Sequence, residues 1–240
     1  MRPETLEVAW GAPASVRAVY TTRRGGASAG RYAECNLGVH VGDDPARVAR
    51  NRRAVVAATG QDGIQWLDQV HGSDVVRVDA VGPAVKADAA WTARPGIALA
   101  VAVADCVPAV VCDAAGTVAG VVHCGWRGAV GGIVEAAVRE LPARAGTLQA
   151  WLGPAICGRC YEVRRDVYDR AGGGPTFRRA GADTWRFDLP EYVARRFETL
   201  GVGAVVRSGL CTRCDDRFFS HRRDGVTGRS AAVVWLDSRS

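Results

Sequence analysis

Three apolar segments of the chain each end at a side chain that can bind a metal. His71 follows WLDQV, Cys106 follows ALAVAVAD, and His123 follows AGVV. The ends of strands deliver side chains to the edge of a sheet, where loops add further contacts. Two imidazoles and one thiolate suit zinc, and three protein ligands leave the fourth tetrahedral position for water or substrate. Taken singly each residue is typical of a core, but the three together predict a catalytic zinc site.

Two carboxylates lie close to these positions in the sequence. Asp105 directly precedes Cys106, and strand alternation sets it on the opposite side unless the strand end twists. It could orient a metal-bound histidine or act as a base. Asp88, in ADAAWT, has the same possibilities, although an aspartate in a turn more often caps backbone amides.

The segment HCGWRG predicts an anion site. Gly125 and Gly128 flank Trp126 and Arg127, so we expect the backbone to turn sharply and the following helix to present free amide groups. An anion there would meet those amides together with the guanidinium of Arg127. Trp126 is expected to pack beneath the turn. The predicted catalytic residues are Cys106, Asp105 and Arg127.

Two further arginine-rich segments have two interpretations each. TTRRGGASAG places Arg23 beside glycines, and HRRDGVTGR contains Arg222, Arg223 and Arg229. Both suit phosphate, yet neither matches a P-loop, and each could be an ordinary turn.

Two Cys-x-x-Cys pairs, at 157/160 and 211/214, could together form a zinc site with four thiolate ligands. About 50 residues separate the pairs, whereas a compact zinc ribbon has roughly 15–20. We favour separate thiols near the pocket, with the four-thiolate site as the alternative.

The composition indicates one domain spanning residues 1–240. A chain of 240 residues with 48% hydrophobic side chains can bury one large core. The expected strands cover residues 16–22, 64–70, 74–78, 97–104, 117–123, 148–152, 203–207 and 231–236. Helices are expected over DDPARVARNRRAVVAATG, IVEAAVREL and PEYVARRFETLG, with Asp44 and Asp188 as caps. This pattern predicts a mixed α/β fold in which a layered sheet core is flanked by helices.

Charge and segment composition limit the cellular setting. The net charge of +6 is moderate, and Lys86 is the one lysine among 31 basic residues. The arginines suit an anionic ligand, and a high-GC genome would enrich arginine equally well. We expect small-molecule partners and no nucleic acid. The first residues do not resemble a signal peptide, and no apolar run reaches the roughly 18 residues of a membrane span. We expect a cytoplasmic protein that binds no membrane, with its eight cysteines present as thiols or ligands. A monomer or weak homo-oligomer is expected.

Seven segments, in this order, resemble the purine nucleoside phosphorylase or multicopper polyphenol oxidoreductase (laccase) domain family, also known as peptidoglycan editing factor. They are TTRRGGASAGRYAECNLGVHVGDDPARVARNR, LDQVHGSDV, ADAAWT, ADCVPAVVCD, VHCGWRG, LGPAICGRCYEV and FFSHRRDGVTGR. The resemblance implies a layered α/β/β/α fold and a zinc site at His71, Cys106 and His123. Within these segments the substrate-binding candidates are Arg23, Asn36, Gln69, Asp88 and Arg223. One departure is Cys124, where relatives commonly have alanine, and we expect this thiol to fill core space.

The resemblance also implies an activity: phosphorolysis of adenosine, inosine, guanosine and methylthioadenosine to the base and ribose 1-phosphate, with adenosine deaminase activity in addition. Two alternatives remain open, an amidohydrolase that edits peptidoglycan precursors and a non-enzymatic partner of envelope or division proteins. Any deaminase would be an independent arrangement, because the chain lacks the signature of zinc nucleobase deaminases.

A laccase-like oxidase is a further alternative. Multicopper oxidases need many histidine ligands and a blue-copper centre normally has an axial methionine. This chain has four histidines, and its one methionine is Met1. We therefore expect copper only as an adventitious occupant of the zinc site, with slow oxidation as a side activity.

Overall fold

Two six-stranded sheets carry the fold in the computed structural model, which describes residues 2–237. The first sheet has the order β1 (Thr5–Glu7), β2 (Val16–Thr21), β15 (Ser230–Leu236), β7 (Ala98–Val103), β3 (Ile64–Asp68) and β5 (Val85–Lys86). The second has the order β14 (Ala204–Arg207), β10 (Leu148–Leu152), β8 (Val107–Asp113), β9 (Ala119–Cys124), β6 (Ala89–Thr92) and β4 (Val75–Arg77). Both sheets mix parallel and antiparallel pairs.

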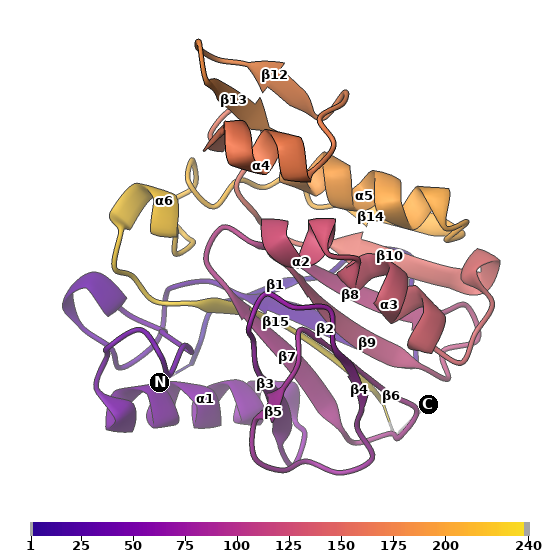
Figure 1. The fold of residues 1–240 in the computed structure, drawn as a ribbon. Coiled ribbons are helices and arrows are strands. Elements are labelled where there is room, and N and C mark those ends of the chain that lie inside the picture. Colours follow the sequence, from indigo (N-terminus) through magenta and orange to yellow (C-terminus); the bar gives the residue numbers. More distant parts are fainter. Residues whose placement is uncertain (1, 238–240) are drawn as a thin grey trace.

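Helices cover the outer faces of the two sheets (Figure 1). Helix α1 (Pro45–Thr59) packs on the first sheet, where its Val55 belongs to one apolar cluster with residues of β3, β7 and β15. Helices α2 (Trp126–Val130), α3 (Ile133–Glu140) and α5 (Leu189–Thr199) pack on the second sheet in another cluster. The expected α/β/β/α layering is thus confirmed. Among the helices of residues 2–237, none has both the length and the apolar character needed to cross a bilayer.

The apolar runs of the sequence form the core between the sheets. Leu99, Val101 and Val103 of β7 lie in one buried cluster with Val110 of β8 and Val121 of β9. All five are at most 1% exposed. These strands are apolar at successive positions because both of their faces are covered, one by the other sheet and one by helices.

The predicted helix caps are present. The side chain of Asp44 accepts a hydrogen bond from the backbone N–H of Ala46, and that of Asp188 accepts one from Glu191. Gly60 ends α1 in the left-handed region at φ 68°, where a residue without Cβ is favoured.

Several elements were not predicted. Strand β8 contains Pro108 next to its first residue, and a proline argues against a central strand. Pro108 is tolerated near the strand end, where its carbonyl accepts a hydrogen bond from Gly153.

A third, antiparallel sheet of β11 (Glu162–Arg164), β13 (Thr184–Phe187) and β12 (Phe177–Arg179) was not predicted either, and it lies beside α4 (Arg165–Arg170). Helix α6 (His221–Asp224) is a single turn. Such short elements contain too few residues for a clear periodicity.

Candidate functional site

The structure brings His71, Cys106 and His123 together. His71 follows β3, Cys106 lies between β7 and β8, and His123 is in β9. One ligand atom from each residue lies within 4.8 Å of the others. The Sγ of Cys106 is 3.9 Å from the Nε2 of His71, and the two imidazole rings are nearly perpendicular with centroids 4.8 Å apart. Three donors from three distant segments therefore face one small volume, as a metal site requires.

A single carboxylate, that of Asp88, positions both histidines. Its Oδ1 accepts a hydrogen bond from the Nδ1 of His123 at 2.7 Å. The same carboxylate accepts hydrogen bonds from the backbone N–H groups of Val70, His71 and Gly72, at 2.7–3.1 Å. Because Nδ1 of His123 is engaged, its Nε2 is the atom available as a ligand. This carboxylate–imidazole arrangement is the usual support of a metal-binding histidine.

Without a metal ion, the charges of these groups stabilise one another. Burial lowers the pKa of His123, but the charge of Cys106 and the hydrogen bond with Asp88 outweigh it and raise that pKa to about 9. Burial raises the pKa of the Cys106 thiol, but the charge of His123 and hydrogen bonds with both histidines outweigh it and lower that pKa. Burial likewise raises the pKa of Asp88, but its hydrogen bonds with His123 and Gly72 hold the pKa below its usual range. A thiolate, two imidazoles and a buried supporting carboxylate fit the donor preferences of zinc.

The backbone is left-handed at two non-glycine residues of the site. Across residues 2–237, His71 (φ 59°) and Asp105 (φ 87°) are the non-glycine positions with positive φ. Such conformations cost free energy and persist where surrounding contacts hold them. For His71 those contacts are the backbone hydrogen bonds to Asp88. Asp105 lines the same cavity as the adjacent Cys106.

The carboxylate of Asp105, the predicted base, binds a second segment of the chain. Its Oδ1 accepts a hydrogen bond from the Oγ1 of Thr212 at 2.6 Å, and its Oδ2 accepts one from the backbone N–H of Arg222 at 2.6 Å. Asp88, and not Asp105, is the carboxylate that contacts a histidine. Asp105 thus joins the β7–β8 turn both to the loop before α6 and to α6 itself.

The reason for the glycines of HCGWRG differs from the expectation. Gly125 has ordinary extended dihedrals, φ −67° and ψ 158°, so no sharp turn requires it. A Cβ there would lie 2.6 Å from Cδ2 of His71 and 3.2 Å from Sγ of Cys106. A Cβ on Gly128 would lie 2.9 Å from the carbonyl oxygen of Gly72. Close approach to the site is therefore what demands glycine, and α2 is only five residues long.

One cavity opens on all three donor residues, and a second opens on His71 and Cys106. The first, of about 330 Å³, is lined by all four histidines of the chain together with other polar residues, namely His40, His71, His123, His221, Gln69, Arg127 and Arg229. The other, of about 220 Å³, shares His71, Cys106 and Arg127 with it and adds an apolar wall of Trp126, Ile156, Tyr161 and Leu189. His40 and His221 were not among the predicted site residues. The scarcity of histidine in the chain was the signal that could have suggested them.

Arg127 is the predicted anion ligand that lines both cavities. Its guanidinium lies over the Trp126 ring, 4.5 Å from the centroid, and its residue is exposed. Among residues 2–237 no acidic side chain forms an ion pair with it. Trp126 is half-buried and packs against the apolar cluster under α2 and α3, while one side faces the cavity.

The remaining candidates are held by the protein itself. Arg23 donates to the carbonyl of Ala33, and Arg223 donates to carbonyls that include those of Thr212 and Phe218. Neither arginine lines the two cavities. The side chains of Asn36 and Gln69 form hydrogen bonds with the backbone. The buried Asn36 accepts hydrogen bonds from the N–H groups of Gly38 and Arg229. Gln69 accepts one from the N–H of Ala102 and donates one to the carbonyl of the same residue.

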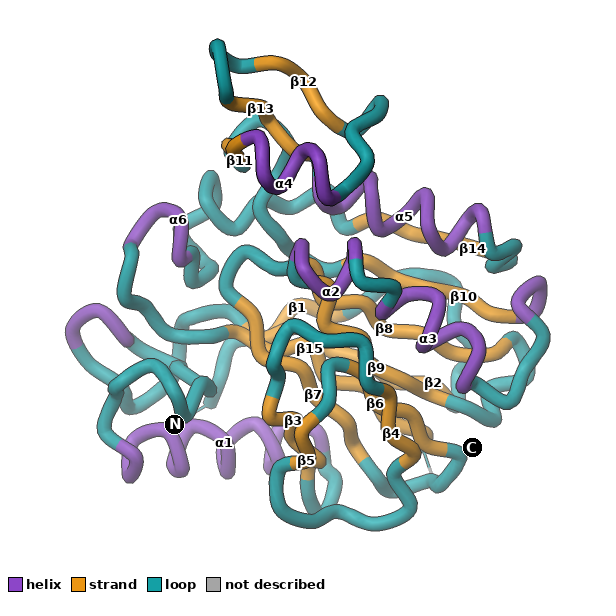
Figure 2. Tube along the Cα trace, in the orientation of Figure 1, coloured by secondary structure: helices purple, strands orange, loops and turns teal. Residues whose placement is uncertain are grey.

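The four cysteines of the Cys-x-x-Cys pairs also converge. Cys157, Cys160, Cys211 and Cys214 offer sulfur atoms that all lie within 4.8 Å of one another. They belong to the loops that lead from β10 to β11 and from β14 to α6, coloured as loops in Figure 2. Sequence spacing favoured separate thiols, whereas the structure places the four together.

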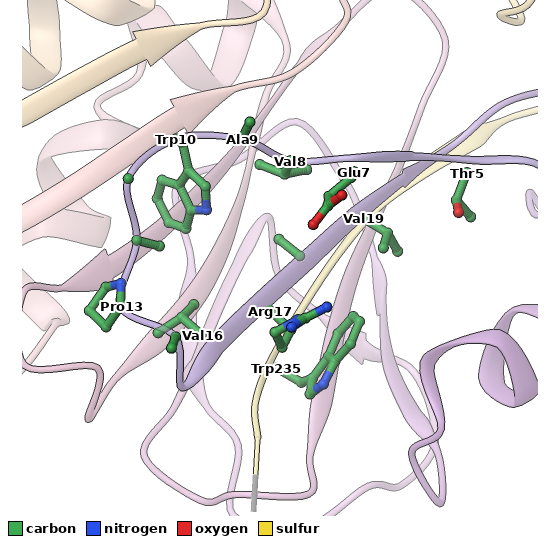
Figure 3. Close-up of a pocket in the computed structure, with 14 residues that line it drawn as sticks. Thr5, Glu7, Val8, Ala9, Trp10, Pro13, Val16, Arg17, Val19 and Trp235 are labelled. Atoms are coloured by element: carbon green, nitrogen blue, oxygen red, sulfur yellow. The ribbon is translucent and has the colours of Figure 1, made fainter. Parts of the chain in front are cut away.

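A separate hollow lies at the other end of the first sheet (Figure 3). Trp10, Arg17 and Trp235 line it, and Trp235 pairs with Ala98 at the start of β7, whereas Cys106 follows the end of that strand. Within residues 2–237, no histidine or cysteine lines it. Its position and lining exclude it from the candidate metal site.

Residues 17–237 match the family described as multi-copper polyphenol oxidoreductase laccase. The chain belongs to this family. A purine nucleoside phosphorylase of Pseudomonas aeruginosa is 43% identical over 95% of this chain and 96% of its own length. The purine nucleoside phosphorylase YfiH of Escherichia coli is 37% identical, with 95% and 96% covered.

Solved structures agree with this assignment to the laccase family. A Neisseria meningitidis protein superposes with a TM-score of 0.93 at 38% identity, over 98% of this chain and 99% of that one. YlmD of Geobacillus stearothermophilus superposes with a TM-score of 0.89 at 32% identity, over 98% and 99%. The expected family and fold are thereby confirmed.

Proposed function

We propose that this chain is a zinc-dependent purine nucleoside phosphorylase. Its substrates would be adenosine, inosine, guanosine or methylthioadenosine together with phosphate. The observation that carries the proposal is the convergence of His71, Cys106 and His123 around one small volume beside a cavity that contains Arg127. The names of the relatives support the reaction class.

The protein's own groups prepare the metal site. Asp88 orients the His123 ring through Nδ1 and fixes the backbone of His71, so that both imidazoles are held before an ion arrives. When bound, a zinc ion supplies a positive charge that can polarise an oxygen atom of a substrate. Such pre-organised charge is most effective in a site that excludes water.

Substrate binding divides between the two cavities in this proposal. Arg127, aided by the half-buried Arg229, would hold inorganic phosphate, because a guanidinium forms paired hydrogen bonds with phosphate oxygens. The apolar wall of the second cavity, which includes Ile156 and Leu189, would bind the purine. In the reaction an oxygen of hydrogen phosphate bonds to C1′ of the ribose, the bond from C1′ to the base nitrogen breaks, and the base takes up the proton that the phosphate loses.

We also assign adenosine deamination to the same site as a second activity. The net reaction takes up one water and releases ammonia, so that adenosine becomes inosine. This activity would need no phosphate, which allows the two reactions to be measured separately on one protein sample.

The decisive assay follows adenosine and its products by chromatography with and without phosphate. Adenine and ribose 1-phosphate appearing only with phosphate support the phosphorylase, and inosine with ammonia supports the deaminase. Release of an amino acid from a muramyl precursor, with adenosine left intact, would replace both by an amidohydrolase.

Two neighbouring cysteines provide matched variants for this assay. Cys106→Ala removes the proposed zinc ligand, and we expect it to abolish both activities. Cys124→Ala removes a fully buried thiol of the α2–α3 cluster, and we expect normal turnover. Full activity of Cys106→Ala, in a protein with unchanged folding, would refute the assigned site.

A further inference from the structure

We propose that Cys157, Cys160, Cys211 and Cys214 bind a second zinc ion, which holds together two walls of the active-site cavity. The four sulfur atoms lie within 4.8 Å of one another, and those of Cys160 and Cys214 are separated by 3.3 Å. With zinc–sulfur bonds of about 2.3 Å, tetrahedral geometry sets sulfur atoms about 3.8 Å apart. The observed cluster therefore needs only small adjustments to enclose one ion.

The backbone presents the two pairs in the same way. In each pair the residue after the second cysteine donates its N–H to the carbonyl of the first: Tyr161 donates to Cys157, and Asp215 donates to Cys211. In addition, the N–H of Cys157 donates to the Sγ of Cys211 at 3.3 Å. Hydrogen bonds from backbone N–H groups stabilise negative charge on sulfur, which a metal-binding thiolate carries.

The relative position of the turns follows from the parallel pairing of β10 and β14. Leu152 is the register partner of Arg207, and beyond the strands Ala155 forms a parallel bridge with Cys211. Thr212 N–H also donates to the carbonyl of Ala155. Because each Cys-x-x-Cys turn follows this shared ladder, the turns arrive side by side, which explains how about 50 intervening residues are compatible with one site.

Charge and access also suit a cation bound by four thiolates. Arg159 and Arg213 lie between the cysteines of their respective pairs, and both are exposed, so they can offset the net negative charge of such a site. Cys157, Cys211 and Cys214 line an open hollow through which an ion can enter. All eight cysteines, each within the described residues, are free thiols.

Zinc is a better fit than an iron–sulfur cluster. The cysteines of an iron–sulfur cluster bind different iron atoms and surround a group larger than one ion. These four sulfur atoms lie close enough together to bind a single ion. Four thiolates leave no open position on zinc, which is typical of a structural role.

The neighbours of the cluster connect it to the active site. Thr212 follows Cys211 and donates to the carboxylate of Asp105, next to Cys106. Ile156 precedes Cys157 and donates its N–H to the carbonyl of Asp105, and Tyr161 follows Cys160 in the wall of the cavity. An ion at the cluster would therefore hold these walls in place without touching substrate.

The test counts zinc per chain in a background that lacks the first site. His71→Ala/Cys106→Ala protein, purified under reducing conditions, is expected to retain one zinc ion by elemental analysis. Adding Cys160→Ser/Cys214→Ser should remove that ion, whereas Cys112→Ala, a buried thiol outside the cluster, should keep it. Because the background variant has no activity to lose, this result is independent of the proposed phosphorylase function.

Cobalt substitution provides a readout that does not depend on the serine variants folding. The background protein loaded with Co²⁺ should show intense thiolate-to-cobalt charge transfer and the ligand-field bands of a tetrahedral site. A background protein without bound zinc, with iron in its place, or with a disulfide between Cys160 and Cys214 after reducing purification would overturn the proposal. So would weak cobalt spectra of octahedral type.

Discussion

Asp88 accepts a hydrogen bond from the Nδ1 of His123 at 2.7 Å, although the two residues are 35 positions apart in the sequence. Strand β9 carries His123 and pairs with β6, which begins directly after Asp88. The same carboxylate holds the left-handed backbone of His71. The geometry of the proposed zinc site thus depends on one buried side chain that would not itself bind the ion.

Replacing this carboxylate should weaken zinc binding. Asp88→Asn keeps the size of the side chain but loses its charge and part of its hydrogen bonding. Loss of such a support typically lowers metal affinity by about 10- to 100-fold. Competition with a chromophoric chelator measures this change, and Asp79→Asn, at an exposed surface ion pair, is the control. Equal zinc affinity in Asp88→Asn and the parent would contradict the positioning role.

A methyl group at position 125 should disturb the site without changing its chemistry. In Gly125→Ala the added Cβ would lie 2.6 Å from the ring of His71, so the ring must move. Overpacking of this kind costs about 1–3 kcal/mol of folding free energy, and we expect zinc affinity and turnover to fall as well. Gly82→Ala, where nothing lies within 4 Å of the new Cβ, should behave as the parent. Denaturant melts and chelator competition on both variants check the prediction.

Arg127→Ala should affect phosphate more than nucleoside or metal. A charge-assisted hydrogen bond contributes about 1.5–3 kcal/mol, which corresponds to a rise of about 10- to 100-fold in the KM for phosphate. The KM for adenosine and the zinc content are expected to change little. Arg139→Ala, which removes an exposed guanidinium paired with Glu140, is the matched control. A variant whose phosphate KM stays within error of the parent would assign phosphate binding elsewhere.

The ionisation of Asp113 should make the free energy of unfolding depend on pH in the acidic range. Burial raises the pKa of Asp113, but hydrogen bonds from Thr117 and Val118 outweigh it and hold the pKa below its usual range. The stabilisation is therefore complete above the unfolded-state pKa of about 4 and is lost as the pH falls through the lower folded-state pKa.

Asp113→Asn should remove this contribution. We expect the free energy of unfolding to fall by about 1–3 kcal/mol at neutral pH, with a smaller further loss between about pH 4 and pH 2 than the parent shows. Urea unfolding over this range measures both effects, with Asp62→Asn, at an exposed position, as the control. A variant that loses stability in acid as steeply as the parent would exclude Asp113 as the source.

The sequence by itself was sufficient for features that depend on neighbouring residues. The caps Asp44 and Asp188 act within one helical turn, and the buried strands are visible as short apolar runs. The three donor residues were also visible locally, because each follows or closes such a run. Periodicity and capping are local properties, so a single sequence contains them in full.

Only the tertiary structure decided which of these groups meet. The contact of Asp88 with His123 depends on the pairing of β6 and β9, and the cysteine cluster depends on the parallel pairing of β10 and β14. The need for glycine at position 125 arises from the approach of His71. Strand order and register bring together residues that are distant along the chain, and the spacing of residue types does not encode that order. The chemistry of the donors was therefore a property of the sequence, whereas their support came from the fold.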